Sequence, residues 1–115
     1  MAILTVTMRN KLVDAYKAAA TYMAVFSTTP TSAGGTELSG GSPAYARKAS
    51  NWGATANSAA TAAPTAFDLP SGGVAAGVGF YDAVTAGNFL DGVGITSQTF
   101  ASQGTLTVTA TFTEA

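Results

Sequence analysis

Three aspartates are the residues of this chain whose chemistry could support catalysis or metal binding. Asp68, Asp82 and Asp91 could serve as paired carboxylates in glycoside hydrolysis or as oxygen ligands for calcium. Each lies at a predicted turn or strand end, where aspartate commonly accepts hydrogen bonds from nearby backbone, and no D-x-D-x-D spacing links them. We therefore interpret all three as structural residues and predict no metal site.

Glycine-rich segments and serines are the next candidates, for phosphate binding and for nucleophilic catalysis. Segments 71–73, 77–79 and 92–94 contain neither a G-x-G-x-x-G run nor a G-x-x-x-x-G-K-[ST] run, and no helix is predicted after them. They are typical of turns and of strands that approach each other closely. The chain has no histidine and no cysteine, which excludes a Ser–His pair, a thiol nucleophile and a Cys/His zinc site. We predict no enzymatic activity and no cofactor.

Aromatic and basic residues are interleaved between positions 45 and 52. On a single strand, Arg47 shares one face with Tyr45, and Lys48 shares the other with Trp52. Two cations on opposite faces make a weak electrostatic footprint, so we predict no nucleic-acid partner. Arg47 is better suited to an ion pair or a subunit contact, and Trp52 to a core or interface position.

The composition is low in charge. Five basic and six acidic residues give a net charge of −1, and charged residues make up 10% of the 115 residues, against about 25% in ordinary soluble domains. This is typical either of a Gly/Ala/Thr-rich sequence from a GC-rich genome or of a subunit that stays in an assembly. We predict one domain over residues 1–115 with no membrane-spanning segment. Arg9 and Lys11 follow the mildly apolar residues 1–7, which is the wrong order for a secretory signal.

The first predicted element is a helix over about residues 7–20. Its predicted inward stripe recurs at helical spacing and consists of Met8, Leu12, Val13, Tyr16, Ala19 and Ala20. Thr7 is the predicted N-cap. The predicted outer face carries Arg9, Asn10, Asp14 and Lys17.

The rest of the chain has strand patterns separated by turn residues. We predict strands over residues 22–26, 45–52, 65–69, 74–82, 89–90, 96–100 and 105–114, with a weak one within 53–63. In the last of these, threonines that face outward alternate with apolar residues that face inward, namely Leu106, Val108, Ala110 and Phe112. The fold class is therefore mainly β: an antiparallel β-sandwich or small barrel of about seven strands with one N-terminal helix.

Residues 28–43 form a predicted loop that is rich in Thr, Ser, Gly and Pro. Connections this long without secondary structure are uncommon, and they tend to be functional, packed against a neighbour or mobile. Because Arg and Tyr are favoured at interfaces, we predict that Glu37 and Leu38 of this loop, with Tyr45 and Arg47, contact another subunit. The alternative is a solvated, mobile loop.

Six short segments follow one another along nearly the whole chain: residues 8–14 (MRNKLVD), 40–49 (GGSPAYARKA), 52–54 (WGA), 67–70 (FDLP), 78–82 (VGFYD) and 86–90 (AGNFL). In this order they resemble a family of small tail-fibre-type or minor tail proteins of actinobacterial phages. The resemblance implies a non-enzymatic component of a tailed-phage virion, on the tail or the capsid exterior, with no cofactor and no catalytic residues.

Three functions remain open at this point. The first is a tail-fibre or minor tail subunit that contacts other virion subunits and forms a symmetric homo-oligomer, such as a trimer or a ring. The second is a head decoration protein that contacts the major capsid protein through its helix end or the 28–43 loop. The third is a host-surface glycan-binding module, which would expose Trp52 or Tyr81 in a shallow patch.

Overall fold

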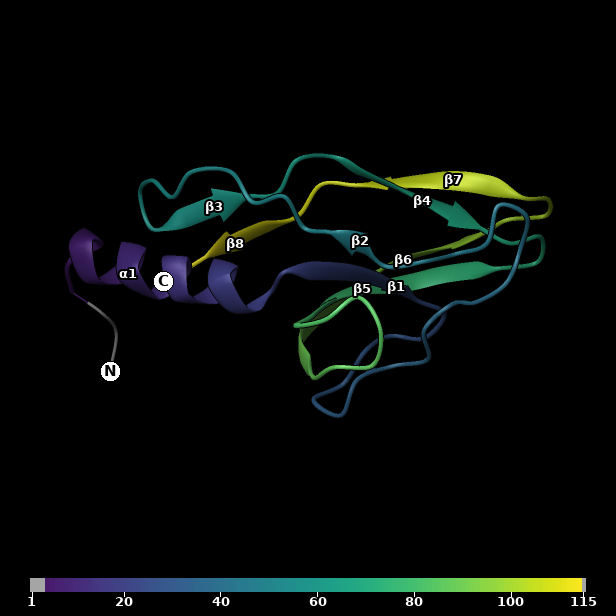
Figure 1. Cartoon of the computed structure of the whole chain (residues 1–115), viewed down its shortest axis with the longest axis horizontal. Helices are drawn as coiled ribbons and strands as arrows, with labels where there is room; N and C mark the ends of the chain where they lie inside the picture. The colour runs from purple at the N-terminus through teal and green to yellow at the C-terminus, as the bar shows by residue number, and fades with distance from the viewer. Residues whose placement is uncertain (1–3, 115) are drawn as a thin grey trace.

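The computed structural model describes residues 4–114, which form two β-layers with a helix at one end (Figure 1). Helix α1 covers Val6–Ala19. Eight strands follow: β1 (Tyr22–Phe26), β2 (Lys48–Ala49), β3 (Ala59–Thr61), β4 (Thr65–Leu69), β5 (Val74–Tyr81), β6 (Phe89–Thr99), β7 (Gly104–Val108) and β8 (Thr111–Thr113). The molecule extends 47 × 25 × 24 Å, and most of its strands run along the long axis (Figure 1). Within residues 4–114 no helix is long and apolar enough to cross a membrane.

The two layers differ in how their strands are paired. One is a four-stranded antiparallel sheet in the order β2-β1-β5-β6. The other consists of two antiparallel pairs, β3-β8 and β4-β7, which lie end to end. One long segment runs through β3 and then β4, and the segment through β7 and then β8 runs beside it in the opposite direction. The predicted mainly β, antiparallel sandwich is confirmed, and residues 4–114 contain eight strands and no closed barrel.

The hydrophobic core lies between these layers. Strand β1 is central in its sheet: Met23 and Val25 belong to this core, whereas Phe26 is buried on the opposite face of the sheet, beside Gly35 and Gly79. Strand β4 supplies the facing layer by simple alternation, because Phe67 and Leu69 are buried while Ala66 is exposed. Both strands were predicted to the residue from this local pattern.

Three of the predicted strands are wrong in extent. Of the predicted strand 45–52, only Lys48–Ala49 pairs with β1, because the preceding backbone turns back through a hydrogen bond of 2.9 Å from Tyr45 N to the Gly40 carbonyl. The predicted strands 89–90 and 96–100 are parts of one strand, β6, of 11 residues.

The C-terminal alternation is confirmed, although the strand is interrupted. The apolar residues from Leu106 to Phe112 are half-buried and the threonines between them are exposed. The chain leaves regular pairing at residues 109–110, where its partner changes from β4 to β3. Phe112 lies at the rim of the core and is only half-buried.

Four glycines form a flat patch on the face of the sheet that points away from the other layer. Gly77 pairs with Gly94 and Gly79 with Gly92 across β5 and β6. Pro30 packs on this patch: a Cβ at Gly77 would collide with its ring, and a Cβ at Gly92 would lie 2.9 Å from its Cγ. The close approach predicted for the glycine segments is therefore confirmed, and it seats the 28–43 loop on the sheet.

The helix docks with only part of the predicted inward face: Val13 and Ala20 are buried and Tyr16 packs against the core, whereas Ala19 is exposed. Its N-cap is Thr5, whose hydroxyl accepts a hydrogen bond from Met8 N at 3.3 Å. Val13 is fully buried, but Met8 and Leu12, predicted to face the core, are exposed. Asn10, predicted to face outward, instead accepts a hydrogen bond of 2.9 Å from Ser58 N in the turn before β3.

Candidate functional site

The four predicted contact residues lie together around one shallow hollow. Glu37, Leu38, Tyr45 and Arg47 line a space of about 360 Å³ whose opposite wall is the turn at residues 84–86. Two hydrogen bonds beside β1 place the loop there: Ser27 N donates to the Thr36 carbonyl at 2.8 Å, and Leu38 N donates to the Val25 carbonyl at 3.1 Å.

Arg47 is the centre of this cluster. Its Nε donates to both carboxylate oxygens of Glu37, at 3.0 and 3.2 Å, and its Nη2 donates to Glu37 Oε1 at 2.9 Å. Its Nη1 donates to the carbonyls of Ala83 at 3.0 Å and Ala86 at 2.6 Å. The guanidinium also lies over the Tyr81 ring, with Cζ 3.5 Å from the ring centroid. The hydrogen bonds to Glu37 raise the pKa of Arg47 above its usual value.

Tyr45 links this cluster to the backbone of β1. Its hydroxyl donates to Glu37 Oε2 at 2.8 Å and accepts from Val25 N at 2.9 Å. Burial raises the pKa of Tyr45 well above its ordinary value, and the Glu37 carboxylate raises it further. The cluster thus joins the 28–43 loop, the 82–88 turn and β1 into one unit. The predicted ion pair of Arg47 is confirmed, whereas its role as a subunit contact stays a prediction.

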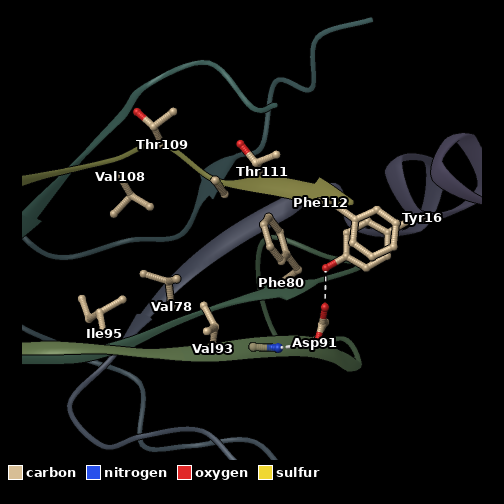
Figure 2. A pocket seen from close by; sticks show the side chains of 12 residues that line it. Tyr16, Val78, Phe80, Asp91, Val93, Ile95, Val108, Thr109, Thr111 and Phe112 are labelled. Carbon is tan, nitrogen blue, oxygen red and sulfur yellow. Dashed lines mark hydrogen bonds between the residues drawn. The ribbon is translucent and has the colours of Figure 1, made fainter. Parts of the chain in front are cut away.

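A second candidate site is an apolar groove between the two layers, on the side where β6 faces β7 and β8 (Figure 2). It has a volume of about 330 Å³. Val78 and Phe80 of β5 form its floor, and β6 contributes Val93, which is 59% exposed, and Ile95. The opposite wall runs from Val108 to Phe112.

Tyr16 of helix α1 closes one end of the groove. Its ring stacks on Phe112, and its hydroxyl donates to Asp91 Oδ2 at 2.6 Å (Figure 2). Asp91 Oδ1 accepts from Gly92 N at 2.9 Å. Burial raises the pKa of Tyr16 well above its ordinary value, and the hydrogen bond to Asp91 adds to this. The phenol therefore stays neutral at physiological pH and acts as a hydrogen-bond donor.

The chemistry of the groove favours contact with another polypeptide. In the sheets of residues 4–114, β6 pairs only with β5, and β7 only with β4, so each presents a free strand edge. Free edges can pair with a further strand, and the apolar side chains beside them can pack against its alternate residues. Sequence reasoning missed this groove. The sequence signal for it was a repeated pattern, Gly77-Val-Gly-Phe80 and Gly92-Val-Gly-Ile95. In each strand this pattern places Val and the large residue two positions later on the same face.

The aspartates weighed for catalysis are held separately. Asp82 accepts hydrogen bonds from Asn88 N and Nδ2, at 2.7 and 2.9 Å, which lower its pKa and close the turn between β5 and β6. Asp68 lies in the other layer, opposite Thr105. Residues 4–114 contain no group of three or more His, Cys, Asp or Glu side chains placed to hold a metal ion.

The two aromatic residues considered for glycan binding are half-buried and packed against other side chains of the chain. Trp52 Nε1 donates to the Ala20 carbonyl at 2.8 Å, and its ring contacts those of Tyr16 and Phe80. The Tyr81 ring is covered by the Arg47 guanidinium. Neither ring is presented as an open stacking surface.

The architecture is that of a small β-sandwich-like module whose candidate sites are open surfaces. The chain matches the family described as Podophage GP4 fiber I protein gp80 over residues 1–113. Because the match covers nearly its whole length, the chain belongs to this family. The family description names a phage fibre protein and no actinobacterial host, so that part of the resemblance stays a prediction. No curated protein and no solved structure gives a match.

Proposed function

We propose that this chain is a non-enzymatic structural subunit of the tail fibre of a tailed phage. The observation that carries the proposal is the family match over residues 1–113. The geometry supports it, because the groove and the hollow are open surfaces suited to protein contacts. The carboxylates of Glu37, Asp82 and Asp91 are each engaged in hydrogen bonds within the chain.

The hollow around Arg47 is the surface that we propose for contact with a neighbouring subunit. The side chains of Arg47 and Glu37 are bonded to each other and fix the shape of the hollow. We therefore expect the apolar side chains of Leu38 and Val84, which line it, to contact the neighbouring subunit. Val84 is 52% exposed. Val84→Glu should lower incorporation into particles, and Ala101→Glu, which adds the same charge at an exposed position outside the hollow, is the control. Equal incorporation of both variants would remove the hollow from the interface.

Immunogold labelling of purified virions tests the location. A tail-fibre subunit gives gold particles at the tail tip or along the fibres, and mass spectrometry of separated heads and tails finds the chain in the tail fraction. Labelling of the capsid surface would overturn this assignment and identify a head decoration protein.

The absence of activity is tested by incubating the purified chain with bacterial wall glycans and peptidoglycan. We expect no turnover. Turnover that Asp91→Asn abolishes would contradict a purely structural role. Saturable glycan binding without turnover would favour the host-binding alternative.

A further inference from the structure

The four-stranded sheet carries a second apolar cluster on its outer face, away from the other layer. Phe26 is fully buried there, and its ring centroid lies 6.3 Å from that of Tyr81 and 5.8 Å from that of Phe89. None of these three side chains is a member of the core between the layers. We call Phe26, Tyr81 and Phe89 the outer aromatic cluster.

Residues 28–36, the first part of the 28–43 loop, cover this cluster. A Cβ at Gly35 would lie 3.3 Å from the Phe26 ring, and a Cβ at Gly34 would lie 3.6 Å from the Phe89 ring. The complete burial of Phe26 therefore depends on this segment.

The covering segment is itself held by few contacts. None of residues 28–36 is buried. Ser27 N and Oγ both donate to the Thr36 carbonyl, at 2.8 and 3.2 Å, and Thr36 N donates to Thr28 Oγ1 at 3.0 Å. Segments with few buried contacts and exposed backbone hydrogen bonds are those that open locally at the lowest free energy.

Both ends of the segment are fixed. It begins just after β1, and at its other end the Glu37 carboxylate is held by Arg47 and Tyr45. Leu38, the next residue, packs against the core between the layers. A loop with anchored, adjacent ends can move as one body without unfolding the elements on either side of it.

We propose that residues 28–36 are a lid that opens while the sandwich stays folded, and that opening uncovers the outer aromatic cluster. In the closed form Pro30 is seated on the glycine patch, where a Cβ at Gly77 or Gly92 would crowd its ring. The open form presents an apolar surface that the closed form does not have. This motion goes beyond the proposed function, because it belongs to the chain itself and not to its place on a virion.

A disulfide between the lid and β6 tests the motion, because the chain has no cysteine of its own. A Cβ at Gly94 would lie 3.8 Å from Thr29 Cβ, a usual Cβ–Cβ separation in a disulfide. In the Thr29→Cys/Gly94→Cys variant, we expect hydrogen exchange at Ser27 N and Thr36 N to be about 100-fold slower in the oxidised form than in the reduced form. Exchange in β4 and β7 should be the same in both forms.

Gly94→Cys alone, given the same oxidation, is the matched control and should show no change in exchange. Equal exchange at Ser27 N and Thr36 N in the two forms of the double variant would mean that the lid does not open, and would overturn the proposal. Slowing of the same size in β4 and β7 would also overturn it, because the opening would then be global.

A dye that binds exposed apolar surface, anilinonaphthalene sulfonate, tests what the lid covers. Pro30 and Asp91 line the same surface depression, so Pro30→Asp should open the lid by charge repulsion. We expect faster exchange at Thr36 N and a severalfold rise in dye fluorescence, whereas Ala33→Asp, at an exposed position of the lid, should leave both unchanged. Wild-type exchange in Pro30→Asp would contradict a lid seated by Pro30. Faster exchange with wild-type fluorescence would contradict its role as a cover.

Discussion

The rings of Tyr16 and Phe112 stack with their centroids 3.8 Å apart and their planes within 6° of parallel. They lie 96 positions apart in the sequence (112 − 16), one on helix α1 and the other on β8. Since the Tyr16 hydroxyl also reaches Asp91 on β6, this one side chain joins the helix to both layers of the sandwich.

The stacked pair should show a measurable coupling energy. Tyr16→Leu and Phe112→Leu each remove one ring and keep an apolar side chain. In a double-mutant cycle measured by urea denaturation, we expect the double variant to lose about 0.5–1.5 kcal/mol less than the sum of the two single losses, because each single variant already loses the shared stacking. Strict additivity would show that the two rings are neighbours without mutual stabilisation.

Folding stability should fall above pH 10 because of Tyr16 and Tyr45. Burial raises the pKa of both phenols in the folded chain, so above pH 10 unfolded tyrosines lose protons that folded ones retain. The stabilisation is complete below the unfolded pKa and is lost as pH rises, by about 1.4 kcal/mol per pH unit for each group. Urea denaturation of Tyr16→Phe and Tyr45→Phe should show a shallower alkaline slope in each, and the shallowest in the double variant. A slope equal to that of the wild type would contradict this assignment.

The Arg47–Glu37 pair should be important for stability. The two side chains are 10% and 23% exposed, so removal of one partner leaves a largely desolvated charge. Arg47→Lys keeps the charge but cannot reproduce the forked contacts, and we expect a loss of about 2–4 kcal/mol in unfolding free energy. Lys11→Ala, at an exposed position, is the control and should stay within about 0.5 kcal/mol. A loss that small for Arg47→Lys would mean that the cluster contributes little to folding.

The glycine patch predicts an unequal response to alanine. A Cβ at Gly79 would lie 2.5 Å from Phe26 Cε2 and 2.8 Å from the Asp91 carbonyl, both in the packed sheet. A Cβ at Gly94 would meet Thr29 Cγ2 at 2.9 Å, in a loop side chain that can move. Gly79→Ala should therefore cost about 1–3 kcal/mol and Gly94→Ala less than about 1 kcal/mol. Thermal unfolding of both variants measures this, and the reverse order would contradict the packing.

The parts of the fold that depend on local pattern could be predicted from the sequence. Strands β1 and β4 are dense in β-branched, aromatic or alternating residues between clear turn signals, and they were located to the residue. Strand β6 was divided, because Gly92 and Gly94 have the same local signature as a turn. Only their pairing with Gly79 and Gly77 shows that they belong to a continuous ladder.

The orientation of the helix was predicted only in part: Val13, Tyr16 and Ala20 pack against the core as the usual rule expects, whereas the apolar Met8 and Leu12 are exposed. Here Asn10 and Lys17 find partners in a turn more than 35 residues away, and these tertiary contacts decide the docking face. Glu37, Leu38, Tyr45 and Arg47 were predicted to contact another subunit; the structure brings all four to one hollow, and the contact itself stays a prediction. The groove was not predicted, because its walls come from strands whose pairing is set by the whole fold.

The direction of the strands has a mechanical consequence. Most of them run along the 47 Å axis, and ladder hydrogen bonds lie perpendicular to their strands (Figure 1). Tension between the two ends of the molecule therefore loads all the bonds of a ladder in shear at the same time, whereas a sideways pull would peel them apart one by one. A rod assembled with this axis along its length resists stretching at every subunit through the combined strength of its β-ladders.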